Sequence, residues 1–261
     1  MGRLALRPGL RAYAHAPAGV EAEFADINSV NFDGVDAYVD LGTTQFITSD
    51  AAWTVSAWFK LDNLTTVYPM IFTSKTDGTQ NWRMAASSHA NYKDVTFGSN
   101  AVFVKRRYEF SMALDTWYHI AVTYNGADAG VSGNFELYID GSAVTHIASG
   151  GYGGDTGNSK LGDEGTTNYI DGLLDNVSIF SSELSAANVA AVYNSGAPRD
   201  LKATTTDYPQ GVIDTLVSWW RLGADSGDAL GAGGILDSVG SNHGTATNML
   251  VGDLSDTDVP T

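Results

Sequence analysis

The strongest constraint on the fold is a recurring alternation of apolar and polar residues in short segments separated by glycine, asparagine and aspartate. In residues 53–61, positions 53, 55, 57 and 59 are apolar, whereas positions 54, 56 and 58 point to the opposite side of an extended chain. Comparable segments occupy residues 37–41, 70–74, 82–86, 102–110, 117–124 and 135–139. This period of two predicts many short β-strands.

Turn residues divide these segments, and one stretch departs from the strand pattern. Asn125-Gly126 and Asp140-Gly141 each follow a predicted strand and tolerate positive φ, so both predict tight turns. Residues 185–195 instead have a helical period, with Ser185 suited to an N-cap and Gly196 just beyond the end. We therefore expect an all-β chain with one short helix in this stretch.

The length suits one domain of this class. A chain of 261 residues with 43% apolar content can bury a substantial core, and sandwiches of this length commonly form one domain. The 29 glycines against 6 prolines agree with many tight turns. No apolar run is long enough to span a bilayer, so we expect no membrane partner.

Charge and cysteine content exclude several classes of partner and site. The formal net charge of -16 repels phosphate backbones, and the basic run at residues 105–107 is too short to reverse that field, so we expect no nucleic acid. The absence of cysteine excludes disulfides and thiolate metal sites. Residues 1–20 lack the uninterrupted apolar core of a secretory signal, so classical export is not expected.

Five segments, in this order, resemble the laminin-G-like family of concanavalin A-like jelly rolls. They are residues 30–39 (VNFDGVDAYV), 53–60 (WTVSAWFK), 117–126 (WYHIAVTYNG), 135–141 (FELYIDG) and 170–180 (IDGLLDNVSIF). The resemblance implies a two-sheet antiparallel jelly-roll sandwich. It also leads us to expect three aromatic rings buried between the sheets, those of Phe32, Trp53 and Trp117.

The same resemblance suggests how the chain is divided. We predict an N-terminal arm at residues 1–28, a laminin-G-like jelly roll at 29–197, and a linker with a C-terminal segment at 198–261. The stretch 216–248 is similar to a segment that commonly precedes the Phe-Asp-Gly strand in this family. We therefore expect residues 215–250 to complete the same sandwich, as in a circular permutation. The alternative is the start of a second module.

The resemblance also implies a cation site. Asp33, the Gly34 carbonyl and Asp175 match positions where related jelly rolls bring the first and last strands together around a cation, and calcium prefers such oxygen ligands. The alternative is that these aspartates cap turns by accepting hydrogen bonds from neighbouring amides. Asp163 and Glu164 form a weaker second candidate in a loop.

Four aromatic residues in or beside polar loops are candidates for a sugar-stacking platform: Trp82, Tyr92, Tyr152 and Tyr169. The alternative is that they pack in the core or across strands, as aromatic residues of β-sandwiches more commonly do.

Catalysis is not expected. Glucanases of this fold carry two glutamates and an aspartate alternating on one strand, because acid and nucleophile must flank one glycosidic bond, and no Glu-x-Asp-x-x-Glu pattern occurs here. The five histidines lack the spacing of a helical zinc pair, and no serine lies in a Gly-x-Ser-x-Gly elbow. We predict that the protein is not an enzyme.

These observations favour a protein that joins an assembly. Laminin-G-like modules resembling this one occur on bacteriophage particles as decoration and fibre proteins, so the resemblance implies a virion surface protein located in the virion. Its partners would be other virion proteins or copies of itself, gripped by an arm that contains Arg3, Arg7 and Arg11. The alternative is an extracellular, calcium-dependent lectin module that binds cell-surface glycans.

Overall fold

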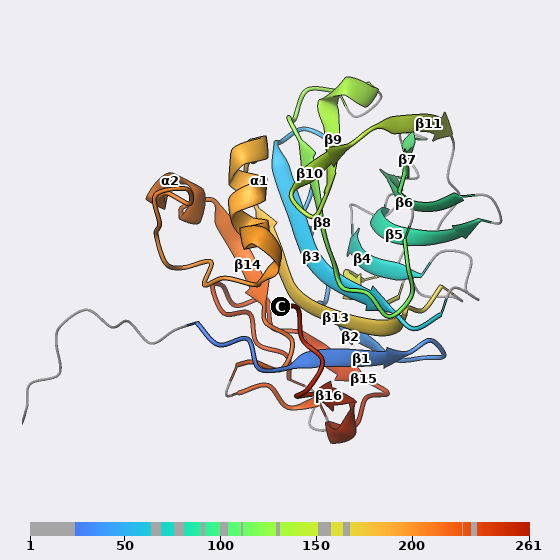
Figure 1. Cartoon of the computed structure of the whole chain (residues 1–261), viewed down its shortest axis with the longest axis vertical. Coiled ribbons are helices and arrows are strands. Elements are labelled where there is room, and N and C mark those ends of the chain that lie inside the picture. The colour runs from blue at the N-terminus through green and yellow to red at the C-terminus, as the bar shows by residue number, and fades with distance from the viewer. Residues whose placement is uncertain are drawn as a thin grey trace, which may run out of the picture.

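The computed structural model describes residues 24–63, 69–75, 81–89, 92–99, 104–110, 112–128, 131–150, 158–163, 168–225, 227–230 and 234–261. Within these residues, two antiparallel sheets of eight strands each are packed as a sandwich (Figure 1). This confirms the predicted fold class. The arm with Arg3, Arg7 and Arg11 lies outside the described residues.

The first sheet contains the longest described strand, β13 (Asp171–Phe180). Its order is β10 (Ser142–Val144), β9 (Phe135–Ile139), β8 (Tyr118–Tyr124), β3 (Trp53–Leu61), β13 (Asp171–Phe180), β1 (Ser29–Asp33) and β16 (Leu254–Ser255), and β14 (Leu216–Trp220) also pairs with β13.

The second sheet covers one face of the first. Its order is β11 (His146–Gly150), β7 (Val104–Glu109), β6 (Tyr92–Ser99), β5 (Asn81–His89), β4 (Met70–Lys75), β12 (Lys160–Leu161), β2 (Tyr38–Asp40) and β15 (Thr245–Thr247).

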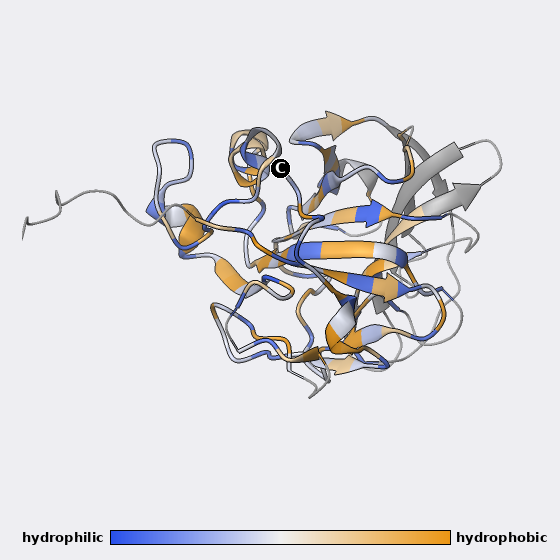
Figure 2. Cartoon of the chain, turned by 60° about the horizontal axis from the view of Figure 1, so that its bottom comes forward, coloured by the Kyte–Doolittle hydropathy of each residue, from blue (hydrophilic) through white to orange (hydrophobic). Residues whose placement is uncertain are grey.

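The main hydrophobic core lies between the sheets because alternate residues of each strand point inward. Figure 2 shows the resulting alternation of apolar and polar bands along the strands. Phe32, Val55 and Phe59 are fully buried there, and Trp53 is 2% exposed. The predicted burial of Phe32 and Trp53 is confirmed, whereas that of Trp117 is wrong, since its side chain is partly exposed and outside this core.

Two helices, α1 (Ala186–Tyr193) and α2 (Gln210–Ile213), lie beside the face of the first sheet that is turned away from the second sheet (Figure 1). We call this the outer face. The predicted helix is α1, which begins after the N-cap Ser185 and ends at Asn194 in the left-handed conformation. A second apolar cluster fills the space beneath the helices and includes Tyr208 and Trp219. No helix of the described residues is long and apolar enough to cross a membrane.

The C-terminal region contributes strands to both sheets. β14 pairs with β13 and β16 with β1 in the first sheet, while β15 pairs with β2 in the second. Adjacent residues of a strand point to opposite faces, so Trp220 enters the main core and Trp219 the outer cluster. Both indoles are at most 1% exposed.

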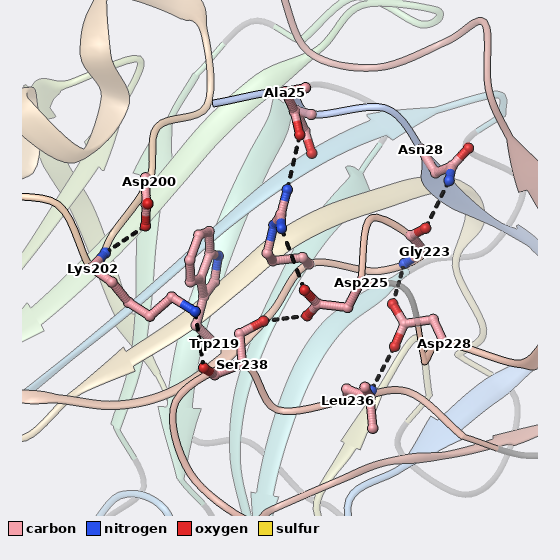
Figure 3. A network of polar contacts seen from close by, with 12 residues as sticks. Ala25, Asn28, Asp200, Lys202, Trp219, Gly223, Asp225, Asp228, Leu236 and Ser238 are labelled. Carbon is pink, nitrogen blue, oxygen red and sulfur yellow. Dashed lines mark hydrogen bonds and ion pairs between the residues drawn. The ribbon is translucent and has the colours of Figure 1, made fainter. Parts of the chain in front are cut away.

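A polar network joins the segment before β1 to the C-terminal region (Figure 3). Arg221 donates to the Ala25 carbonyl at 2.9 Å, and the Asn28 amide donates to the Gly223 carbonyl at 2.7 Å. The Asp228 carboxylate accepts from the backbone N–H groups of Gly223 and Leu236, each at 2.7 Å. The contacts of Asn28 and Arg221 connect residues that are 195 and 196 positions apart in the sequence.

Candidate functional site

The outer face of the first sheet carries a row of side chains near one end of β1, β13 and β3. Asn31 lies opposite Leu173, and Leu173 lies opposite Lys60. Since neighbouring strands are about 4.8 Å apart, this row spans about 10 Å. All three residues line a groove of about 340 Å³.

The chain's C-terminal segment forms the other wall of this groove. Pairing of β16 with β1 places residues 252–258 beside the row, and Asp62 follows the end of β3. We call the whole site the C-terminal groove, defined by Asn31, Lys60, Asp62, Leu173 and residues 252–258. Lys60 of the floor and Asp258 of the wall are 198 residues apart in the sequence.

Asp258 is held in place by three donors, two to its carboxylate and one to its backbone carbonyl. Its carboxylate forms an ion pair with Lys60 and accepts a hydrogen bond of 2.9 Å from the Trp117 indole nitrogen. The Ser29 hydroxyl donates to the Asp258 carbonyl at 2.7 Å. These contacts fix the C-terminal segment against the sheet.

Strand parity explains why Trp117 lies here rather than in the core. Ile120, Val122 and Tyr124 of β8 point into the main core, so residues of odd number point to the outer face. The pairing of β3 with β8 ends at Phe59 opposite Tyr118, and Trp117 therefore continues the row beside Lys60. The expected core tryptophan is instead an aromatic residue beside the groove.

The groove has an excess of negative charge. It is lined by four aspartates, Asp62, Asp253, Asp256 and Asp258, and by one cation, Lys60. Asp258 is paired with Lys60, and Asp253 accepts from the Leu250 N–H at 2.6 Å. Asp62 and Asp256 are exposed. Burial raises the pKa of the nearby Asp171 carboxyl, and the charges of Asp62 and Asp33 raise it further.

This arrangement suits a polar ligand of small size. The carboxylates accept hydrogen bonds, Lys60 and Asn31 can donate them, and Leu173 and Leu254 add apolar surface. A volume of about 340 Å³ lies at the lower end of the range for small-molecule sites. The groove can therefore hold a compact molecule that is rich in hydroxyl or amino groups.

The residues predicted to hold calcium do not come together. Asp33 pairs with Asp171, and Asp175 lies four residues further along β13, which corresponds to about 13 Å in an extended chain. Asp33 Oδ1 accepts from the backbone N–H groups of residues 35, 36 and 37 at 2.9–3.1 Å, and these bonds lower the pKa of Asp33 although burial opposes them. Asp33 and Asp175 thus do not fit one shared ion.

In the described part of the chain, no three histidine, aspartate or glutamate side chains lie close enough together to hold a metal ion. Of the second loop candidate, Asp163 is buried and pairs with Lys160 at 2.5 Å, whereas Glu164 lies outside the described residues. Calcium binding stays a prediction. A bound ion would stabilise only the native state, so a chelator-dependent fall in melting temperature is the test.

Asp175 belongs to a buried polar cluster beneath the outer face. The register of β3 and β13 shifts between Asp175 and Ser178, and Asn176 adopts a φ of 46° at this bulge. Asp175 is fully buried and accepts from the Asn176 backbone at 2.6 Å, while Asn176 also donates to Asp26 at 2.9 Å. Burial raises the pKa of Asp175 well above its usual value, and the Asp26 carboxyl raises it further.

We expect Asp175→Asn to stabilise the protein at neutral pH. The pKa of the Asp175 carboxyl is raised in the folded state. Its contribution to the free energy of unfolding is therefore complete below about pH 3.8 and is lost as the pH rises from there to the folded-state pKa. The amide cannot ionise, so the variant should gain roughly 1–4 kcal/mol at pH 7 and almost nothing at pH 3. Urea unfolding at both pH values measures this, with the exposed Asp50→Asn as control. A loss of stability at pH 7 would contradict it.

Of the four candidate stacking residues, Tyr169 has a described side chain, and it does not line the C-terminal groove. Tyr169 is half-buried, and burial followed by the charge of Asp163 raises its pKa. The backbone of Trp82 lies in β5 and that of Tyr92 in β6, but their side chains are outside the described set, as is the whole of Tyr152. Their role in sugar binding stays a prediction.

The groove residues themselves were missed at the sequence level. Lys60 ends an alternating strand and reads there as an ordinary exposed residue. The aspartates of residues 253–258 (DLSDTD) form a short acidic stretch that was a recognisable signal. Nothing in the sequence, however, indicates that this stretch returns to the side of Lys60.

Comparison with known proteins agrees with this architecture. Residues 33–190 match the family model Laminin G 3, described as the concanavalin A-like lectin/glucanases superfamily. Comparison with curated protein sequences finds no match.

Three solved structures match parts of this chain. A candidate carbohydrate-binding protein from Bacteroides ovatus ATCC 8483 is 15% identical with a TM-score of 0.60, and the match covers 90% of this chain and 61% of that one. A heptameric SAP-like pentraxin from Limulus polyphemus is 18% identical with a TM-score of 0.44, covering 64% and 82%. Domain 4 of an extracellular arabinanase from Geobacillus stearothermophilus, in complex with arabinotriose, is 18% identical with a TM-score of 0.42, covering 63% and 76%.

Proposed function

Since the chain belongs to the laminin-G-like family of the concanavalin A-like lectin/glucanase superfamily, we propose that it is a non-catalytic carbohydrate-binding module whose glycan lies in the C-terminal groove. One observation carries this proposal. The row of Asn31, Leu173 and Lys60 and the aspartates of the C-terminal segment together line a groove of about 340 Å³. The description of the Bacteroides ovatus protein agrees with it.

The chemistry of a sugar fits these groups. Hydroxyl groups of a pyranose donate to carboxylates and accept from amide and ammonium groups, and bonds to charged groups are the stronger ones. Asp62 and Asp256 are exposed, so they are accessible to such a ligand. The partly exposed Trp117 beside Lys60 adds an aromatic surface at the border of the groove. An extracellular or surface location follows from this proposal.

Removal of two groove side chains should weaken binding. We expect the double variant Asn31→Ala/Asp62→Ala to bind its glycan roughly tenfold more weakly or worse, because each lost hydrogen bond contributes about 0.5–1.5 kcal/mol. The measurement is affinity electrophoresis on neutral, aminated, uronic and sialylated polysaccharides, followed by titration calorimetry on those that bind.

Asp50→Ala is the matched control, since this exposed carboxylate precedes β3 at the end opposite Lys60. Unchanged affinity in the double variant would place the glycan elsewhere. Loss of binding in Trp82→Ala or Tyr152→Ala, with the groove variant unaffected, would favour the aromatic positions predicted from sequence. Turnover of any polysaccharide on the panel would contradict the non-catalytic part of the proposal.

The virion role remains a prediction. It requires that residues 1–20, with Arg3, Arg7 and Arg11, hold the protein on a particle or on copies of itself, and these residues lie outside the described part of the chain. Deleting residues 1–20 tests it, because an unchanged assembly state would count against an arm that anchors the module.

A further inference from the structure

The C-terminal groove has more negative than positive side chains, and this excess should affect neutral, cationic and acidic glycans differently. Four aspartates face one lysine there, and the lysine is already paired with Asp258. Among the described residues that line the groove, there is therefore no cation left unpaired to meet an acidic sugar. Two of its carboxylates, Asp62 and Asp256, remain exposed to a ligand.

Further carboxylates of the described chain lie near this groove. Asp171 and Asp33 lie close enough to Asp62 for the charges of Asp62 and Asp33 to act on Asp171. The chain as a whole carries a formal net charge of -16. A uronate or sialate would thus enter a negative field, whereas an ammonium group would be attracted by it.

Resting on the proposed function, we infer that the C-terminal groove selects amino sugars with a free, protonated amino group over their N-acetylated forms and over acidic glycans. The ammonium group would lie between Asp62 and Asp256 and pair with these carboxylates, because Lys60 is already paired with Asp258. The sugar hydroxyl groups would bond to Asn31 and to the hydroxyl residues of the C-terminal wall, Ser255 and Thr257.

The size of this preference follows from exposed ion pairs. One such pair changes affinity by about two- to fivefold, so two carboxylates should favour the aminated ligand by roughly five- to twentyfold at physiological salt. Salt of about 1 M shortens the screening length to about 3 Å and should remove most of the preference.

The experiment compares three hexasaccharides by titration calorimetry at pH 6: a glucosamine hexamer, its N-acetylated counterpart, and a galacturonate hexamer. We expect affinity to fall in that order. The double variant Asp62→Asn/Asp256→Asn should bind the aminated and acetylated hexamers equally. The control Asp50→Asn/Asp128→Asn removes two exposed charges near Tyr124, at the opposite end of β8 from Trp117, and should retain the preference.

The outcomes separate this inference from the proposed function. Equal or tighter binding of the acetylated or uronate hexamer, or a preference that survives in Asp62→Asn/Asp256→Asn, would overturn the charge selectivity and leave carbohydrate binding intact. Absence of binding to these hexamers and to the polysaccharide panel would overturn both. Native-like melting of every variant excludes misfolding as the cause of a loss.

Discussion

Replacing Trp220 by alanine is expected to lower the free energy of unfolding by about 3–5 kcal/mol, which is a large part of the stability of an ordinary domain. The indole is fully buried in the main core and lies edge-on to Phe46 at 5.4 Å. Its nitrogen donates to the Asn242 carbonyl at 2.8 Å. Truncation leaves a cavity in the core and also an unpaired carbonyl.

Urea unfolding of Trp220→Ala measures this loss. Val217→Ala in the same strand is the matched control, because Val217 is 38% exposed and its truncation should cost about 0.5 kcal/mol or less. A loss below about 1 kcal/mol in Trp220→Ala would contradict the packing of β14 into the sandwich. The same measurement tests whether the C-terminal region, which forms one wall of the groove, is packed into the sandwich.

The second large effect is a loss of stability in acid that depends on His119. This side chain is fully buried, and burial lowers its pKa to about 3. Below pH 6.5, His119 is protonated in the unfolded chain but stays neutral in the folded chain. The free energy of unfolding therefore falls as the pH falls from about 6.5 to about 3. At about 1.4 kcal/mol per pH unit, the total loss is on the order of 5 kcal/mol.

The acid loss is checked by comparing the wild type with His119→Gln in urea at pH 7.5 and pH 4. At pH 7.5 the variant should be the less stable, because it disturbs the 2.7 Å contact of the imidazole with Ser56 and the packing against Trp58. Its stability should depend less on pH, so that the difference shrinks or reverses at pH 4. Parallel curves for wild type and His119→Gln would contradict the prediction.

The strands could be predicted because their signal is local. A period of two in residues 53–61 is a property of neighbouring residues, and the structure confirms a strand over that range. The position of Trp117 was predicted wrongly although parity was available, since Ile120 and Val122 set the inward positions of β8 and an odd-numbered residue cannot share them.

The candidate site was much less accessible to sequence reasoning. Asp33 and Asp175 were grouped by resemblance, but the register of β1 and β13 places Asp171 opposite Asp33. A shift of four residues along a strand moves a side chain about 13 Å, which decides whether two carboxylates meet. Such registers depend on pairing between distant segments.

By itself, the sequence determined the class of fold, many of the strand segments, the helix at residues 186–193 and the negative charge, because each depends on composition or on residues close in the chain. Only the tertiary structure decided that Lys60 and Trp117 meet Asp258 and that a groove opens between them. The reason is physical: the row across β1, β13 and β3 is set by backbone hydrogen bonds between strands, and its wall by a segment that returns almost 200 residues later.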